Sequence, residues 1–143
     1  MSGIFNVPLI LASSSPRRIA LLDQVRLKVE VFHPDVAERR KKGESPQKMV
    51  ARLARDKAQA AATAAIWKHG SAVIIAADTC VVAPDRKTVL GKPRNEREAK
   101  KMLGLLNGRF HIVHTAYCLL AVAREMDSKS FVKVVSSRVK MRK

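Results

Sequence analysis

The sequence has 143 residues, 47% of them hydrophobic, and its 28 Lys and Arg against 12 Asp and Glu give a formal net charge of +16. Six Gly and six Pro in so aliphatic a chain exclude collagen-like, low-complexity and wholly disordered proteins, because those compositions cannot bury enough apolar surface to offset the entropy of ordering. The length predicts one folded domain over residues 1–143.

The first predicted elements are a strand, a short loop and a helix. Residues 8–12 form a short apolar run, and serines and a proline follow it. Ser15 suits the N-cap, and Pro16 suits the first helical position because its missing N–H would be unpaired there in any case. Apolar residues then recur at helical spacing up to Leu22. A second strand is predicted over residues 29–32.

A long helix is predicted from Ser45-Pro46 to just before Gly70, since the same cap and proline start it and glycine commonly ends a helix. At about 100° per residue, apolar side chains form a stripe with Lys57 near its middle. The stripe consists of Val50, Leu53, Ala54, Ala61, Ala64 and Ala65. Two interpretations of Lys57 stay open: the ammonium reaches water at the edge of the stripe, or it points into an anion-binding site.

Residues 72–83 are almost entirely apolar and rich in Val and Ile, which predicts a central strand covered on both faces. Asp78 interrupts this run. A carboxylate there is costly unless it is paired, hydrogen-bonded or bound to a metal ion, so Asp78 is a strong candidate for a functional residue. The alternative is a local break in the strand, at which Asp78 and Thr79 form a bend.

A hairpin and a third helix are predicted next. Residues 84–87 signal a turn between two apolar segments. Asn95 with Glu98 resembles a capping box, and the helix that it starts should end near Gly108. The buried stripe of this helix is expected to be Ala99, Met102, Leu103 and Leu106.

Two strands, over residues 110–123 and 131–141, complete the chain. The predicted order is therefore strand, helix, strand, helix, strand, strand, helix, strand, strand. This order predicts an α/β fold in which helices flank a mixed central β-sheet.

The sequence also indicates the cellular compartment of the protein and the state of its two cysteines. No apolar run reaches the roughly 18–20 residues that cross a bilayer, and residues 1–11 lack the positively charged segment of a secretory signal. A cytoplasmic protein with no membrane partner is expected. Cys80 and Cys118 lie inside apolar runs and are expected to be buried, reduced and inert.

The basic charge favours a polyanionic partner of some kind: nucleic acid, an anionic membrane surface or a small phosphorylated ligand. The aromatic content of 4% argues against a stacking platform for single strands, and neither zinc-finger spacing nor an RRM-type signature is present. A non-catalytic nucleotide or nucleic-acid binding module is therefore the alternative to an enzyme.

The loop between the first strand and the first helix could bind phosphate, because free backbone N–H groups and the positive end of the helix dipole meet there. An ordinary capped helix with two surface arginines is the alternative. A polyphosphate hydrolase needs cations for the phosphates and carboxylates for Mg²⁺ and for activating water. The candidate cations are Arg17, Arg18, Lys57 and Lys92, and the candidate carboxylates are Glu38 and Asp78.

Six short motifs lie in a fixed order along the chain: Leu9–Arg18, Pro34–Glu38, Arg52–Ala58, Ala77–Thr79, Gly91–Pro93 and Leu106–Arg109. In order and spacing they resemble the Maf family of nucleoside triphosphate pyrophosphatases. The resemblance implies hydrolysis of a nucleoside triphosphate between its α- and β-phosphates, with Mg²⁺ or a similar divalent ion. It implies phosphate contacts from Ser13, Arg17, Arg18, Lys57 and Lys92, metal binding by Glu38 and Asp78, and catalysis by Asp78.

The same resemblance refines the expected substrate and architecture. The Arg17-Arg18 and Asp78-Thr79 pairs look like the branch of the family that acts on dTTP, UTP or modified pyrimidine nucleotides. A homodimer is common in this family. Its members continue into a second lobe with Asp-Lys-Ala-Gly, Tyr-Gly-Ile-Gln and Gly-Leu-Pro segments, which this sequence lacks. The expectation is thus a Maf/ITPase-like fold with its second lobe truncated and its hydrolysis impaired.

Overall fold

A computed structural model describes residues 7–143 of the chain. Its elements are β1 (Leu9–Ala12), α1 (Pro16–Gln24), β2 (Glu30–Phe32), α2 (Pro46–His69), β3 (Ser71–Val82), β4 (Val89–Leu90), α3 (Glu96–Leu106), β5 (Phe110–Ala123) and β6 (Met126–Lys140). The predicted α/β fold with a mixed sheet is confirmed. None of the helices in residues 7–143 is long and apolar enough to span a membrane.

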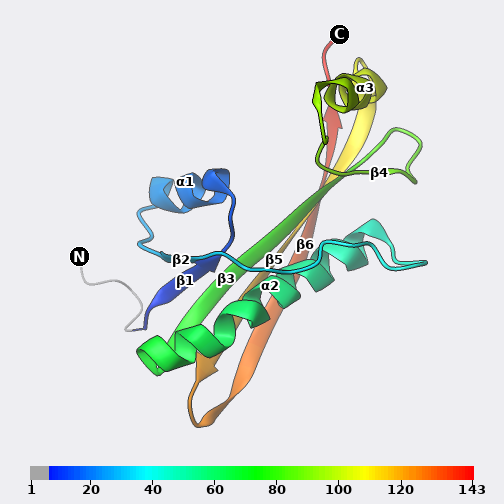
Figure 1. Cartoon of the computed structure of the whole chain (residues 1–143). Coiled ribbons are helices and arrows are strands. Elements are labelled where there is room, and N and C mark those ends of the chain that lie inside the picture. The colour runs from blue at the N-terminus through cyan, green and yellow to red at the C-terminus, as the bar shows by residue number, and fades with distance from the viewer. Residues whose placement is uncertain (1–6) are drawn as a thin grey trace.

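Within residues 7–143 the sheet has six strands: five follow the order β2-β1-β3-β5-β6, and β4 pairs with the end of β3 as the predicted hairpin. β1 runs parallel to β2 and β3, whereas β3, β5 and β6 are antiparallel neighbours, as Figure 1 shows. The pairing of β1 with β3 stops where Ala12 faces Ala76. Beyond this point, and among the described residues, β3 has β5 as its only strand partner until it reaches β4. The carboxyl end of β1 therefore leaves one edge of β3 accessible around Asp78.

The predicted limits of α2 are confirmed, because both helix ends are fixed by local interactions. The Ser45 hydroxyl accepts a hydrogen bond from the Lys48 backbone N–H at 3.2 Å, and Pro46 occupies the first turn. At the other end, Gly70 has a φ of 76° and its N–H bonds to the Ile66 carbonyl. Glycine adopts this left-handed conformation without the steric penalty of a Cβ.

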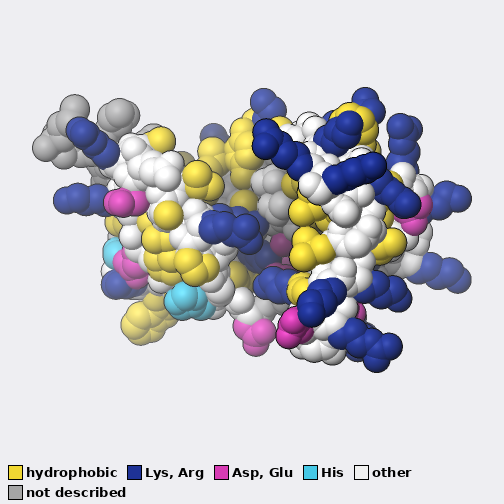
Figure 2. All heavy atoms as spheres, turned by 90° about the horizontal axis from the view of Figure 1, so that it is seen from above, with side chains coloured by type: hydrophobic (Ala, Val, Ile, Leu, Met, Phe, Trp, Pro, Cys, Tyr) yellow, Lys and Arg dark blue, Asp and Glu magenta, His cyan; other side chains and the backbone are white. Residues whose placement is uncertain are grey.

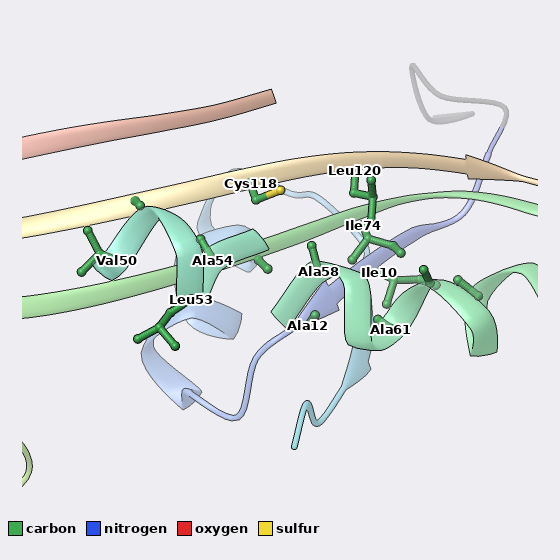
Figure 3. Packing of buried hydrophobic residues seen from close by; sticks show 14 of the residues in the cluster. Ile10, Ala12, Val50, Leu53, Ala54, Ala58, Ala61, Ile74, Cys118 and Leu120 are labelled. Carbon is green, nitrogen blue, oxygen red and sulfur yellow. The ribbon is translucent and has the colours of Figure 1, made fainter. Parts of the chain in front are cut away.

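The core lies between α2 and one face of the sheet, which we call the covered face (Figure 3). On β3 the covered face consists of Ala72, Ile74, Ala76, Asp78, Cys80 and Val82. The α2 residues in the core are Met49, Val50, Leu53, Ala54, Ala58, Ala61, Ala62 and Ala65. Ala64, predicted for this stripe, is exposed instead. Cys80 and Cys118 are free and buried as expected, and burial raises the pKa of both thiols.

The opposite face of the sheet, which we call the open face, is only partly buried. On β3 it consists of Val73, Ile75, Ala77, Thr79 and Val81. The prediction of a strand covered on both faces is wrong, since within residues 7–143 only α2 packs along the sheet; α1 follows the carboxyl end of β1, and α3 lies near the start of β5 (Figure 1). Apolar side chains therefore remain exposed on the open face, with Phe131 at 55% and Val135 at 47%.

α3 confirms the predicted start of the third helix but not its predicted packing. Asn95 accepts a hydrogen bond from the Glu98 N–H at 2.9 Å. The Glu98 carboxylate instead accepts from the Arg94 N–H, so only half of the capping box forms. The expected stripe of Ala99, Met102, Leu103 and Leu106 is not buried, and Leu103 is 53% exposed. In the described part of the chain the apolar face of α3 has no sheet beneath it, because the helix lies near the end of the strands (Figure 1).

The last two strands form one long antiparallel hairpin. β5 has the predicted bounds, whereas β6 begins at Met126, five residues before the predicted start at residue 131. Residues 124–130 are mostly polar or charged, so they show no alternation of apolar and polar residues. Their backbone nevertheless pairs because β5 supplies the hydrogen-bonding edge.

Candidate active site

Asp78 lies in the middle of unbroken β3, so the alternative of a strand break at Asp78 and Thr79 is wrong. Its side chain points to the covered face and is nearly buried. Lys57 reaches it from α2, and its Nζ lies 2.7 Å from Asp78 Oδ1. The same Nζ lies 2.8 Å from Oε1 of Glu38. One ammonium thus joins two carboxylates from separate segments of the chain.

Of the two interpretations of Lys57 from the sequence, an ammonium that reaches water at the edge of the apolar stripe does not fit this arrangement, and a role in binding an anionic ligand stays a prediction. The residue is 7% exposed, so its ammonium does not reach water at the edge of the core. The anions that it meets are carboxylates of the chain itself. A buried ammonium is costly unless it is paired and hydrogen-bonded, and Asp78 and Glu38 supply both.

Glu38 comes from the irregular segment before α2, and its side chain is about half exposed. The hydrogen bond from Lys57 is the main reason why the pKa of Glu38 is lowered from its usual value, and the charges of Lys57, Lys92 and Arg18 lower it further. Glu38 is therefore ionised at neutral pH. Its exposed carboxylate forms the solvent-facing side of the site.

Ser13 follows β1 directly and is the most buried residue of the loop that starts α1. Its Oγ accepts hydrogen bonds from the Ser15 N–H at 3.1 Å and from Arg18 Nη1 at 3.4 Å. Ser15 occupies the predicted N-cap position, but its own side chain makes no capping hydrogen bond. The local geometry of this loop is thus organised by Ser13.

Arg18 projects from α1 towards β3. Its Nη2 donates a hydrogen bond to Thr79 Oγ1 at 3.3 Å. Burial lowers the pKa of the Arg18 guanidinium, and the charges of Asp78 and Glu38 oppose this effect. Arg18 consequently lies within the field of both carboxylates, although neither of them forms an ion pair with it.

Arg17 and Lys92 are exposed, and neither side chain forms a hydrogen bond or ion pair within residues 7–143. The charge of Lys92 helps to lower the pKa of Glu38, which places Lys92 within electrostatic reach of the site. The structure therefore brings Ser13, Arg18, Lys57, Glu38 and Asp78 together and leaves Arg17 and Lys92 at the periphery. Figure 2 shows a hollow between the parts of the molecule that carry α1 and α3, bordered by Lys and Arg side chains.

Sequence reasoning missed Thr115 of β5. Its Oγ1 lies 2.9 Å from Thr79 Oγ1, and the two residues face each other in the β3–β5 register. A threonine in an apolar strand is common, and only the register of the two strands brings it next to Thr79.

Four cations and two carboxylates surround this site, so its net charge is positive and favours a polyanion. Mg²⁺ takes oxygen ligands and is commonly held by one or two carboxylates together with substrate phosphates. Residues 7–143 contain no group of three or more His, Cys, Asp or Glu side chains arranged for a metal ion. Glu38 and Asp78 are the carboxylates of the site that could serve as ligands of such an ion.

The sequence model of the Maf-like protein family matches residues 8–143. The chain is 46% identical to the dTTP/UTP pyrophosphatase of Saccharophagus degradans, an alignment that covers 92% of the chain and 62% of that protein. It is 42% identical to the dTTP/UTP pyrophosphatase of Desulfotalea psychrophila, covering 92% and 63%. It is also 40% identical to the 7-methyl-GTP pyrophosphatase of Cupriavidus pinatubonensis, covering 94% and 63%. The chain thus spans less than two thirds of the length of each of these relatives.

Among solved structures, the Ham1 protein of Staphylococcus aureus is similar, with a TM-score of 0.51 and 18% identity. The superposition covers 90% of this chain and 70% of that protein. At this identity, the similarity supports the fold alone.

Proposed function

This chain belongs to the Maf-like protein family, and we propose that it is a nucleoside triphosphate pyrophosphatase, which hydrolyses the bond between the α- and β-phosphates and releases the nucleoside monophosphate and pyrophosphate. The buried pair of Lys57 and Asp78, 2.7 Å apart, carries the proposal. A buried ion pair seldom stabilises a fold more than well-packed apolar residues would, so its place beside three further cations favours a function. The names of the relatives support the same reaction.

In the proposed complex, the polyphosphate binds between α1 and the Lys57 ammonium. Arg18 can grip two phosphate oxygens with its guanidinium fork, and Arg17 and Lys92 add charge at the rim. The Ser13 hydroxyl already accepts two hydrogen bonds, so its hydrogen is free to be donated to a phosphate oxygen. Lys57 gains a phosphate partner beside the two carboxylates.

Asp78 is proposed to accept the proton of the attacking water. Lys57 binds its Oδ1, and Oδ2 has no hydrogen bond within residues 7–143. As the water oxygen bonds to the α-phosphorus, the bond from this phosphorus to the oxygen bridging the α- and β-phosphates breaks. The proton passes to Asp78 and pyrophosphate leaves. Lys57 holds the carboxylate in place during the transfer, which is the role of a positioned general base.

Mg²⁺, or a similar divalent ion, is proposed to be held by Glu38 and Asp78 together with the phosphates. When bound, such an ion neutralises phosphate charge and polarises the phosphoryl oxygen. The carboxylates of Glu38 and Asp78, on either side of Lys57 Nζ, would supply oxygen ligands for this ion.

The pyrimidine triphosphates dTTP and UTP, or their modified forms, are the proposed substrates. The Arg17-Arg18 and Asp78-Thr79 pairs and the names of two relatives support this choice. A cytoplasmic location and a homodimer are proposed from the family resemblance alone, and size-exclusion chromatography with light scattering tests the second.

The direct test is to incubate the purified chain with Mg²⁺ and dTTP, UTP or 7-methyl-GTP and to measure pyrophosphate and monophosphate release. We expect release from the two pyrimidine nucleotides. Asp78→Asn should lower kcat by about 10²- to 10⁴-fold, as removal of a general base does. Comparison of the kcat of this chain with the kcat of the full-length Saccharophagus degradans relative tests whether hydrolysis is impaired, as expected.

Asp127→Asn is the matched control, because Asp127 is exposed in the β5–β6 hairpin and the same chemical change there should leave kcat unaltered. Equal rates for the wild type and Asp78→Asn would reject the proposed role of Asp78. Binding of dTTP without any release of pyrophosphate would favour the non-catalytic binding module.

A further inference from the structure

Arg18 is held by a chain of hydroxyl groups that crosses two strands. Ser13 Oγ accepts from Nη1 at 3.4 Å, and Thr79 Oγ1 accepts from Nη2 at 3.3 Å. Thr79 Oγ1 in turn lies 2.9 Å from Thr115 Oγ1 on β5. Both terminal nitrogens of the guanidinium are therefore held by hydroxyls. Through Thr79, Nη2 is linked to Thr115 of β5, a strand that carries no other proposed site residue.

The direction of the hydrogen bond between Arg18 and Thr79 follows from the chemistry of the two groups. A guanidinium can only donate, so Thr79 Oγ1 is the acceptor in its contact with Arg18. A hydroxyl has one hydrogen, and the hydrogen of Thr79 must point away from the guanidinium. Thr79 Oγ1 and Thr115 Oγ1 share a hydrogen bond at 2.9 Å, in which either hydroxyl can be the donor. In either direction this bond restricts the rotation of the Thr79 hydroxyl and keeps a lone pair of Thr79 Oγ1 available to Arg18.

The strand register makes this arrangement rigid. Thr79 and Thr115 face each other directly in the β3–β5 pairing, and opposite residues on one face of an antiparallel pair are close enough for Thr–Thr hydrogen bonds. Both side chains lie on the open face, whereas Asp78 points to the covered face. The site therefore uses both faces of β3 where β1 has ended.

Neutral partners hold Arg18, while charged partners hold Lys57. The Lys57 ammonium contacts two carboxylates, which offset its charge. Within residues 7–143 the Arg18 guanidinium donates hydrogen bonds only to hydroxyls, which fix its orientation and leave its charge available for an anion. Such preorganisation lets a cation bind a phosphate without first losing an ion pair.

We propose that Thr115 is a positioning residue, which through the Thr79 hydroxyl holds the Arg18 guanidinium in the orientation that binds a phosphate of the triphosphate. The proposal rests on the proposed function, since it assigns a further residue to the same site. Thr115 itself does not contact the phosphate.

The test measures binding of inorganic tripolyphosphate by isothermal titration calorimetry and the KM for dTTP. Thr115→Val keeps the shape of the side chain and removes the hydroxyl, and we expect it to weaken tripolyphosphate binding and to raise KM by about three- to tenfold, the effect of losing one hydrogen bond. Thr115→Ser, which keeps the hydroxyl, should restore wild-type values. Thr63→Val, at an exposed position on α2, is the control and should change neither.

A double-mutant cycle separates positioning from a purely structural role. If Thr115 acts through Arg18, then Thr115→Val should have no further effect on tripolyphosphate binding once Arg18→Ala is present. An equal loss in both backgrounds would overturn the proposal, as would a Thr115→Ser variant that behaves like Thr115→Val. Thr79→Val, which removes the hydroxyl that Arg18 contacts, should weaken binding at least as much as Thr115→Val, and an unchanged affinity would also overturn it.

These readouts distinguish the two proposals. If the wild type binds tripolyphosphate but hydrolyses no triphosphate, the proposed reaction is rejected and the affinities still decide the role of Thr115. If the wild type does not bind tripolyphosphate, Arg18 does not serve a phosphate site and the role of Thr115 is rejected.

Discussion

The two faces of the sheet have similar apolar residues and very different burial. On β3, Ile74 points to the covered face and is fully buried, whereas its neighbour Ile75 points to the open face and is partly exposed. The difference comes from α2, whose alanines let the helix backbone approach the strands closely (Figure 3). Burial here depends on what packs above the strand and not on the hydrophobicity of the strand itself.

The two faces also hold different parts of the candidate site. The covered face holds the ion pair of Lys57 and Asp78, where low exposure strengthens electrostatic interactions. The open face holds Thr79 and Thr115, which contact Arg18 through neutral hydroxyls. The parts meet at one point because β1 ends at Ala12 and leaves the edge of β3 accessible from both sides.

The most severe test of the comparison replaces the two neighbouring isoleucines in turn. Ile74→Ala should lower the free energy of unfolding by about 2–5 kcal/mol, the usual cost of a cavity in a packed core. Ile75→Ala should cost about half as much or less, because part of its side chain is already in water. Urea denaturation followed by circular dichroism measures both. Equal losses would show that the open face is as well packed as the covered face.

A second test adds volume instead of removing it. Ala58 lies on the side of α2 that packs on the sheet and is fully buried. Ala58→Leu should therefore destabilise the protein by about 1–3 kcal/mol through overpacking. The matched change Ala64→Leu, on the exposed side of the same helix, should stay within about 0.5 kcal/mol. If Ala58→Leu were tolerated equally well, the close approach of α2 would not be the reason for the burial of the covered face.

The smallest expected effect concerns a titratable group on the covered face. His114 of β5 is 4% exposed, and burial lowers its pKa from the usual 6.5. The unfolded chain therefore binds a proton at a higher pH than the folded protein does. The stabilisation is fully present above about pH 6.5 and is lost progressively as the pH falls through the lowered pKa of the folded state.

His114→Gln should therefore flatten the dependence of the free energy of unfolding on pH between about pH 7 and 5.5, the range in which histidine titrates. The comparison of both proteins at about pH 8, where the imidazole is neutral, gives the cost of the lost packing and of the contact between Nδ1 and Ser136 Oγ at 2.7 Å. An identical slope in both proteins would contradict the lowered pKa.

Local signals in the sequence predicted the elements whose ends are local. Ser45, Pro46 and Gly70 determine α2 through neighbouring residues, so its limits could be predicted. Asp78 and Lys57 could be singled out for a related reason, because each is a charged residue at a position where the surrounding pattern demands an apolar one.

The failed predictions concern contacts between distant segments. The apolar stripe of α3 indicated a buried face, but a helical pattern does not determine whether another element lies beneath it. In β3, apolar residues occupy both the odd-numbered and the even-numbered positions, so the sequence is compatible with burial of one face of the strand or of both. The contact of Thr115 with Thr79 depends on strand register, which no single strand contains.

The order of the elements, the ends of α2, the basic charge and the exceptional charged residues could be predicted from the sequence, because they follow from composition and from interactions between neighbours. The folded structure was needed to establish that Lys57 joins Asp78 to Glu38, that Arg18 is held by hydroxyls, and that one face of the sheet is covered and the other open. These features depend on the packing of α2 and on the pairing of β3 with β5, which bring together residues that lie far apart in the chain.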